Sequence, residues 1–372
     1  MTQSDRPEPW GHGPDEALRA LPKTDLHVHL IGCVRASTLQ DLASRYGVPL
    51  PLPAHELYPR INSDPTEEES GRGPWFPLLR IYELICSCLR EAEDFARVTY
   101  EALEDGLAES GTVYQELAIS PTVHLSHQVN YPTVARGVQL GIERARDKLG
   151  VDARVIAAIN REDSEASALA LVDEIVRNPI PEVVALGLDF DERKGPPQRF
   201  IEAFRRAGAA GLHRTAHAGE HVAAAANVLI CLNELGCERI DHGYHVLQDP
   251  AIVAECRRRR VVFNVALTTS RRALRPWRRR SVGEMLQQGL RVSLNSDDPK
   301  LFPTTLAHEF EIARKEVGVR VPELAQMLRN GVEAAFCDRR AQAGLRERLE
   351  SALRTAGPEW AAAGVDAPGS GS

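Results

Sequence analysis

Two histidines near the N-terminus, His27 and His29, have the type and spacing to bind a metal ion. They stand in the stretch 24–30, where leucines and a valine alternate with Asp25 and the two histidines. This two-residue period is typical of an extended strand, in which residues i and i+2 share a face. His27 and His29 would therefore project together, as two ligands of one ion must. On its own, an H-x-H also fits two imidazoles on a solvated edge strand.

Three later segments carry similar groups, each at the end of a predicted strand. They are Thr215–Glu220, which contains His217, then Asp241–His245, and then Ser293–Pro299, which contains Asp297 and Asp298. A histidine or acid buried at such a place needs a metal, a charged partner or a role in proton transfer. For the Asp pair alone, an N-cap followed by a turn at Pro299 is the alternative. Together, the segments predict a metal-dependent hydrolase.

The candidate ligands are three imidazoles and one carboxylate, from His27, His29, His217 and Asp297. This set suits one Zn²⁺ per chain and leaves a coordination position for water, whose pKa the metal lowers toward neutrality. Glu220, three residues after His217, is placed to donate a proton to the substrate from beside the metal. His242 is placed to orient or deprotonate the water, and Asp298 has its side chain free for the substrate.

Strand-like and helix-like segments alternate along the chain that must position these groups. After the first strand, the predicted strands are Thr112–Ile119, Ala153–Ile159, Val183–Phe190, Leu212–His217, Arg239–His242, Val261–Val265 and Val292–Asn295. The predicted helices between them are Ala36–Tyr46, Phe95–Glu109, Pro132–Leu149, Glu165–Arg177, Arg199–Ala210, Val222–Leu235, Pro250–Arg258 and Val282–Gln288. Eight such units predict an α/β fold, a (β/α)8 TIM barrel of the metal-dependent hydrolase type, with active-site groups at the C-terminal ends of its strands.

Composition and segment character set the limits of the domain. We expect a flexible tail over residues 1–20, a single barrel domain over 21–356 and a second flexible tail over 357–372. A lid is expected at about 51–90, because a Pro-rich stretch without periodicity, 51–73, precedes an apolar helix that begins near Trp75. Packing of that helix in the core is the alternative.

Charge and cysteine content argue against several classes of protein. The net charge of -7 argues against nucleic acid or an anionic membrane as the main partner, and the arginine runs 257–260 and 278–280 are expected to be solvated. Seven cysteines without a repeated spacing do not form a disulfide framework, and neither a leader nor a membrane-spanning run is evident. A cytoplasmic protein, monomeric or homodimeric, is the simplest expectation.

Four motifs in order extend this interpretation: H-x-H after Leu21-Pro-Lys, then T-x-H-A-G-E, H-G-Y-H and S-L-N-S-D-D-P. From about Leu21 to Asp338 the chain resembles the adenosine deaminase family of the amidohydrolase superfamily. The resemblance implies that the four candidate ligands hold zinc, that Glu220 protonates purine N1, that His242 handles the hydroxide, and that Asp298 contacts N7. It implies attack of zinc-bound hydroxide on C6 of a 6-aminopurine nucleoside, with loss of ammonia.

The departures from the family pattern concern the substrate. Ile31 stands where the family usually has an acid that contacts the ribose, and an aliphatic side chain favours an apolar or bulky 5′ group. Phe190 replaces a glycine expected near purine N3, and the segment after the seventh strand, 264–270, lacks the usual C-P-x-S. The expected substrate contacts are therefore His29, Ile31, Phe190 and Asp298. Asp241, where the family usually has glycine, is expected to point away from His242 with a modest electrostatic effect.

Three functions compete. The first is deamination of adenosine or of a 5′-modified adenosine, such as 6-aminodeoxyfutalosine or 5′-methylthioadenosine, and basic residues near 193 and 271 would suit a carboxylate on the substrate. The second is another mononuclear-metal amidohydrolase that acts on a different heterocyclic amine or amide. A binuclear site is disfavoured because Lys194 lies beyond the expected end of its strand. The third, a non-catalytic nucleoside sensor, is disfavoured because every ligand and Glu220 are present.

Overall fold

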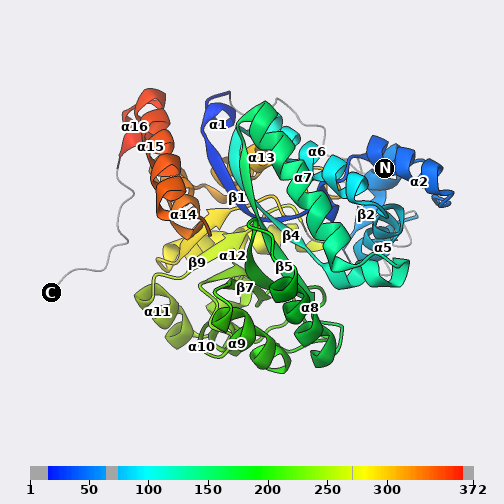
Figure 1. Cartoon of the computed structure of the whole chain (residues 1–372). Helices are drawn as coiled ribbons and strands as arrows, with labels where there is room; N and C mark the ends of the chain where they lie inside the picture. The colour runs from blue at the N-terminus through cyan, green and yellow to red at the C-terminus, as the bar shows by residue number, and fades with distance from the viewer. Residues whose placement is uncertain (1–15, 64–73, 270, 363–372) are drawn as a thin grey trace.

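The fold is a barrel of eight parallel strands, as the sequence predicts, seen here in a computed structural model that describes residues 16–63, 74–269 and 271–362 (Figure 1). The strands are β1 (Lys23–His29), β4 (Thr112–Ile119), β5 (Asp152–Asn160), β6 (Val183–Asp189), β7 (His213–Ala218), β8 (Arg239–His242), β9 (Val262–Val265) and β10 (Arg291–Leu294), neighbours in that order. Every residue of β1 is buried, as expected where helices cover the outside and side chains fill the inside.

The two ends of the sheet meet through a narrow contact. β1 and β10 share no ladder, but Val28 pairs with Asp297 in an isolated parallel bridge just beyond β10. There the Asp297 N–H donates to the His27 carbonyl at 2.9 Å, and the His29 N–H donates to the Asp297 carbonyl at 2.8 Å. Below this bridge, the Leu26 N–H donates to Asn295 Oδ1 at 2.8 Å. Barrel closure therefore fixes an expected metal ligand, Asp297, directly beside His27 and His29.

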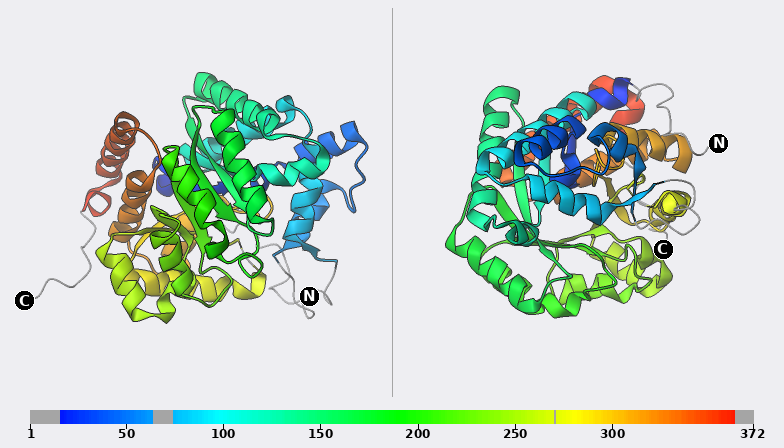
Figure 2. Two further views of the ribbon diagram at one scale, coloured as in Figure 1. Left: turned by 60° about the horizontal axis from the view of Figure 1, so that its bottom comes forward. Right: turned by 90° about the vertical axis from the view of Figure 1, so that its right-hand side faces the viewer.

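Helices and helical turns occupy the connections on the outside of the barrel (Figure 2). In chain order they are α1 (Glu16–Ala20), η2 (Ile31–Cys33), α2 (Ala36–Tyr46), α3 (Ala54–Leu57), η3 (Tyr58–Arg60), α5 (Leu78–Cys88), α6 (Ala92–Ser110), η4 (Pro121–His127), α7 (Tyr131–Leu149), α8 (Glu165–Arg177), η5 (Pro197–Phe200), α9 (Ile201–Ala209), α10 (Ala226–Asn233), η6 (Tyr244–Gln248), α11 (Pro250–Arg258), η7 (Arg272–Leu274), α12 (Arg275–Gln287), α13 (Leu306–Ile312), η8 (Ala313–Val317), α14 (Val321–Ala334), α15 (Arg339–Ala356) and α16 (Pro358–Ala361). None of the described helices combines the length and apolar character needed to cross a bilayer.

Local signals explain where several of these helices begin and end. α7 starts after Asn130, whose side chain accepts the Thr133 N–H, and it ends at Gly150 with a φ of 66°. A side-chain N-cap and a left-handed glycine are strong start and stop signals. Two starts differ from the prediction by more than three residues. α10 begins at Ala226 rather than 222, and α12 begins at Arg275 rather than 282, because its first two turns are rich in arginine rather than apolar.

The expected lid region contains more regular structure than the predicted irregular stretch. Over 51–63 it holds α3, η3 and the short strand β2 (Ile61–Asn62), which pairs with β3 (Phe76–Pro77) directly before α5. Residues 64–73 lie outside the described part of the chain. Figure 1 shows α2, β2 and α5 together at one side of the barrel, opposite α15 and α16. The apolar helix predicted after Trp75 is therefore present as α5.

Both predicted tails are too long at their inner ends. Residues 16–20 form α1, in which Leu18 is fully buried and its carbonyl accepts a hydrogen bond from Lys23 Nζ. Residues 358–361 form α16, in which Trp360 is 5% exposed. Each short helix is held by the packing of one apolar side chain. A single apolar residue does not stand out in a segment that is otherwise polar or rich in small residues, so composition alone does not predict these helices. The remaining tail residues, 1–15 and 363–372, lie outside the described part.

Candidate metal centre and active site

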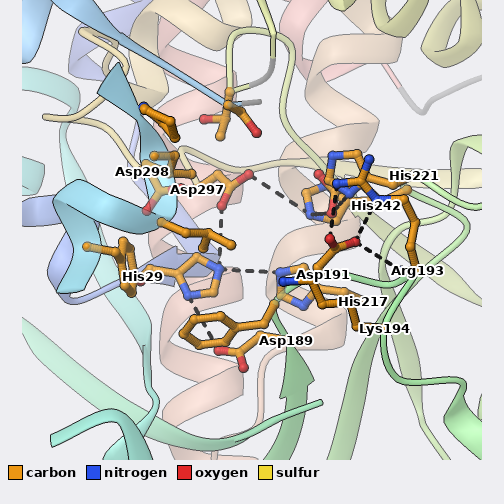
Figure 3. A pocket seen from close by; sticks show the side chains of 18 residues that line it. His29, Asp189, Asp191, Arg193, Lys194, His217, His221, His242, Asp297 and Asp298 are labelled. Atoms are coloured by element: carbon orange, nitrogen blue, oxygen red, sulfur yellow. Dashed lines mark hydrogen bonds and ion pairs between the residues drawn. The ribbon is translucent and has the colours of Figure 1, made fainter. Parts of the chain in front are cut away.

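Four side-chain atoms from three strand ends converge at the C-terminal end of the barrel. His27 Nε2 and His29 Nε2 lie 3.1 and 3.3 Å from His217 Nε2, and each lies 3.5 Å from Asp297 Oδ1. Bonds of about 2.0–2.2 Å in a tetrahedral zinc site would place neighbouring ligand atoms about 3.3–3.6 Å apart. The spacing of the predicted ligands therefore fits one small divalent ion. Figure 3 shows His29, His217 and Asp297 turned toward one another.

The imidazoles are held with their Nε2 atoms free for a ligand bond. His217 Nδ1 lies 3.1 Å from the Leu188 carbonyl and His27 Nδ1 3.5 Å from the Asn264 carbonyl. Because a carbonyl only accepts, each Nδ1 must carry the proton, which leaves the Nε2 lone pair toward the cluster. His29 Nδ1 has no hydrogen-bond partner among the described residues, and Asp189 Oδ2 lies 3.9 Å from it.

Burial sets the protonation states that a metal requires. Burial lowers the pKa of His217 to about 3 and that of His29 well below its usual value, where the neighbouring histidines add to the effect. Both imidazoles are therefore neutral, the state that binds metal. Burial raises the pKa of Asp297 well above its usual value, and the adjacent Asp298 adds to this. Two buried carboxyl groups side by side are costly, and a cation among them removes that cost.

The three predicted catalytic residues surround this cluster. His242 Nε2 lies 3.5 Å from Glu220 Oε2 and 4.0 Å from Asp297 Oδ2. The other ring nitrogen, His242 Nδ1, lies 3.4 Å from the hydroxyl of Tyr244, which itself donates to the Ala266 carbonyl. That hydroxyl can therefore accept from Nδ1–H, which leaves Nε2 as a proton acceptor that faces Glu220. Asp298 lines the same cavity, and its Oδ1 has no hydrogen-bond partner among the described residues.

Backbone strain is concentrated in this part of the molecule. Five non-glycine residues have positive φ in the described chain, and three of them line the site: Phe190 at 66°, His242 at 71° and Asp297 at 60°. Left-handed backbone costs an L-residue roughly 1–2 kcal/mol and persists only where surrounding contacts impose it. Asp and His tolerate this conformation better than Phe does. Phe190 is therefore a strained residue at the position where the family pattern expects glycine.

Above the cluster lies a cavity of about 370 Å³. One wall is apolar and comes from the lid region, where Pro77, Leu78, Leu79 and Tyr82 line it. The opposite wall is the segment after β6, including Phe190, whose ring centroid lies 6.0 Å from that of Tyr82. The volume lies within the range typical of small-molecule sites. The helix α5 thus contributes to this wall, and a lid over the cavity stays a prediction.

Not all of the residues predicted to contact the substrate line the cavity. Of the expected contacts, His29, Phe190 and Asp298 line the cavity, whereas Ile31 is not among the described lining residues. Ile31 is 5% exposed in η2, the turn that packs against α5. Arg193 and Lys194 do line the mouth, where they pair with Asp191 at 2.8 Å and Glu162 at 2.5 Å. Arg271 is not part of that lining.

The structure corrects one expectation about charged residues and adds a contact to another. Asp241, which is expected to point away from His242, has its Oδ1 3.9 Å from His27 Nδ1 and accepts from Asn264 Nδ2 at 2.8 Å. Burial lowers the pKa of His27, and the next largest influence is the charge of Asp241, which raises that pKa. Arg278 is not solvated, because it is 1% exposed and its Nη2 lies 2.7 Å from Glu220 Oε1. Residues 257–260 are exposed as predicted.

A third charged residue, Glu192, escaped the sequence analysis altogether. It is 3% exposed and accepts the backbone N–H groups of Gly219 and Glu220 at 2.7 and 3.0 Å. Nothing in its local sequence distinguishes it from an ordinary acidic loop residue between Asp191 and Arg193. Only the fold brings it to the loop after β7.

Comparisons with known proteins agree with this geometry. The family model described as adenosine deaminase matches residues 22–352. An adenine deaminase of Vibrio parahaemolyticus is 28% identical over 90% of this chain and 96% of its own length, and an adenosine deaminase of Salmonella typhi is 31% identical over 89% and 98%. A zinc-bound amidohydrolase of Burkholderia ambifaria superposes with a TM-score of 0.82 at 29% identity, covering 92% of this chain and 94% of that one.

Proposed function

Because the chain belongs to the adenosine deaminase family of hydrolases that act on C–N bonds, we propose that it deaminates a 6-aminopurine nucleoside, adenosine or a 5′-modified adenosine. The products are the 6-oxopurine nucleoside and ammonia. The observation that carries the proposal is the convergence of His27, His29, His217 and Asp297 at the base of a cavity of about 370 Å³. The Nε2 atoms of His27 and His29 each lie 3.1–3.5 Å from His217 Nε2 and from Asp297 Oδ1.

The proposed cofactor is one Zn²⁺ held by these four residues. A bound Zn²⁺ would supply a water of lowered pKa and Lewis-acid polarisation. The donor set of three neutral imidazoles and one carboxylate supports zinc, as does the zinc in the Burkholderia relative. The position of Lys194 supports a single ion, because its Nζ pairs with Glu162 at the cavity mouth.

Proton movement is assigned to the pair His242 and Glu220. His242 Nε2 faces Glu220 Oε2 at 3.5 Å and so is positioned to take a proton from the attacking water and pass it on. Burial opposes ionisation of Glu220, but His221, His242 and Arg278 together hold its pKa well below the usual value. Glu220 therefore starts as a carboxylate and donates to N1 only after it has received a proton. Asp298, with its free Oδ1, would orient the ring through N7.

The nucleoside assignment rests on the upper part of the cavity. Beyond the cluster, the space continues between the apolar wall of α5 and the ion-paired mouth at Arg193 and Lys194, which leaves room for a group attached to the purine. Ile31 is proposed to act on the 5′ end through η2 and α5, which pack together. A hydrogen bond to a 5′-hydroxyl is impossible for this aliphatic side chain.

A deamination screen of the zinc-loaded protein tests the proposal. The panel is adenosine, 2′-deoxyadenosine, 5′-methylthioadenosine, S-adenosylhomocysteine, 6-aminodeoxyfutalosine and adenine, followed by ultraviolet absorbance and by ammonia release. We expect a nucleoside to be the best substrate by kcat/KM. A preference for adenine would overturn the nucleoside assignment, and no turnover of any purine by metal-loaded protein would overturn the purine assignment. The Glu220→Gln variant, purified in parallel, controls for deaminases of the expression host.

A further inference from the structure

The loop that carries Glu220 is held in place by a single buried carboxylate. Glu192 Oε1 accepts the Gly219 N–H at 2.7 Å, and its Oε2 accepts the N–H groups of Glu220, His221 and Val222, each at 3.0 Å. Four consecutive backbone amides thus converge on one side chain that is 3% exposed. The amide of Asn227 adds a longer contact at 3.4 Å.

The four N–H groups form an anion-binding site, and the carboxylate of Glu192 occupies it. Gly219 has a φ of 64°, and alternation of left-handed with ordinary backbone turns successive N–H groups toward one point. Hydrogen bonds from amides to an ionised acceptor are roughly twice as strong as neutral ones. Without Glu192, four N–H groups in a partly buried loop would lose their partner, and the loop would have to rearrange to satisfy them.

The carboxylate of Glu220 is fixed from the opposite side by Arg278. Arg278 Nη2 donates to Glu220 Oε1 at 2.7 Å, while its Nη1 donates to the Thr269 carbonyl at 2.5 Å. The guanidinium is 1% exposed and lies over the ring of Tyr244, 4.9 Å from the ring centroid. Tyr244 in turn contacts His242 Nδ1 at 3.4 Å. Arg278 therefore connects the two residues proposed to move protons.

We propose that Glu192 and Arg278 are positioning residues that fix Glu220 from two sides, Glu192 through its backbone and Arg278 through Oε1, so that Oε2, which lies 3.1 Å from His221 Nδ1, also faces His242. The proposal rests on the proposed function, because Glu220 matters only if it serves a proton transfer. Neither residue lines the cavity, so neither is assigned a contact with substrate.

The test must distinguish a positioning role from a role in folding alone. A residue needed only for folding would lower the yield and melting temperature without changing the kinetics of the folded protein. A positioning residue would lower kcat and leave KM nearly unchanged, because the substrate still binds while the transition state loses an aligned group. Misplacement by about 1 Å costs on the order of 100-fold in rate.

The experiment compares two variants of each residue with matched controls. Glu192→Gln keeps the shape of the side chain but loses one acceptor oxygen and the charge. Glu192→Asp keeps the charge, but its shorter side chain places the carboxylate farther from the four N–H groups. Arg278→Met removes both hydrogen bonds, and Arg278→Lys restores one. Asp338→Asn is the control for Glu192, because Asp338 also accepts two backbone N–H groups, at the start of α15. Arg279→Met controls for Arg278, because Arg279 is the next residue of α12 and pairs with Glu316.

Steady-state kinetics and amide hydrogen exchange are then measured on the zinc-loaded proteins. For Glu192→Gln we expect kcat to fall on the order of 100-fold with KM nearly constant, and exchange to rise in the peptide that contains 219–222. For Arg278→Met we expect a similar loss in kcat without that rise, and partial rescue in Arg278→Lys. The two controls should keep wild-type kinetics.

Two outcomes would overturn the positioning roles: unchanged kcat in folded Glu192→Gln and Arg278→Met, or unchanged exchange of 219–222 in both Glu192 variants. Failure of the proposed function is distinguishable, because the wild-type protein would then deaminate no purine. Hydrogen exchange needs no substrate, so it would still decide whether Glu192 holds the loop. If Glu192→Gln does not fold, the Glu192→Asp variant supplies both readouts.

Discussion

Two clusters of buried charge in the same barrel have opposite characters. At the start of β8, Arg239 and Glu116 form an ion pair, both at most 1% exposed. Arg239 also donates to the carbonyls of Ala334 and Leu26 at 2.8 and 3.1 Å, and Tyr114 donates to Glu116 at 3.0 Å. At the other end of the strands, the histidine and aspartate cluster borders a cavity and leaves polar atoms without a partner.

The difference shows which buried charges indicate function. The Arg239–Glu116 pair uses most of its hydrogen-bonding capacity within the protein, and its one unpartnered atom in the described structure, Arg239 Nε, does not line the cavity. In the other cluster, His29 Nδ1, Asp189 Oδ1 and Asp298 Oδ1 have no hydrogen-bond partner in the described structure. Buried polar atoms without partners are costly, and they persist where a ligand completes them. Burial alone therefore does not identify a site, but burial with incomplete pairing at a cavity does.

The largest expected effect comes from removing the acid of the incomplete cluster. Glu220→Gln keeps the size of the side chain but cannot carry a proton to N1, so kcat should fall by about 10²–10⁴-fold. The kcat is compared per folded molecule, because the substitution also removes the carboxylate that pairs with the buried Arg278 at 2.7 Å and should lower the melting temperature. Retention of more than a tenth of the wild-type kcat would remove Glu220 from the reaction.

The ion pair at the start of β8 should affect stability without affecting kcat. Glu116→Gln leaves Arg239 buried without its counter-charge, so we expect a loss of about 3–5 kcal/mol in the free energy of unfolding. Urea unfolding measures this loss, and kcat per folded molecule should remain at the wild-type value. A change in kcat without loss of stability would mean that this pair is coupled to the active site.

A smaller effect is expected from the carboxylate beneath His27. Asp241 lies 3.9 Å from His27 Nδ1 and favours a basic Nε2, so Asp241→Asn should weaken zinc affinity by about 10–100-fold. Competition with a chromophoric chelator gives the affinity directly. Equal affinity in the variant and the wild type would show that the Asn264 carbonyl alone orients the ring.

The smallest expected effect concerns the choice of substrate. Ile31→Asp should raise kcat/KM for adenosine relative to a 5′-modified adenosine by about tenfold, because a carboxylate is costly to bury within η2 and would turn into the cavity, where it can accept from the 5′-hydroxyl. The same substrate panel measures the ratio. An unchanged ranking would mean that the 5′ end is recognised elsewhere, for instance by the walls formed by Leu78, Tyr82 and Phe190.

The sequence predicts the barrel and the convergence of the four candidate ligands because both follow from local patterns. Strand alternation places His27 and His29 on one face, and the fold brings all strand ends to one place. The charged residues around Glu220 do not follow from local patterns. Arg278 stands in an arginine run that looks solvated, yet α12 turns it inward, and Glu192 gains its role from amides 27–30 positions away. Contacts of this kind depend on tertiary structure, which periodicity and spacing do not encode.

The measurement that tests the account most directly is a metal titration of the metal-free protein. Zinc content by plasma mass spectrometry and deamination rate are followed together as Zn²⁺ is added, with Glu220→Gln as a control that should bind metal without turnover. We predict that the rate rises in proportion to bound zinc and reaches its maximum at one ion per chain. Full activity in metal-free protein, or a maximum only at two ions per chain, would contradict a single catalytic metal at His27, His29, His217 and Asp297.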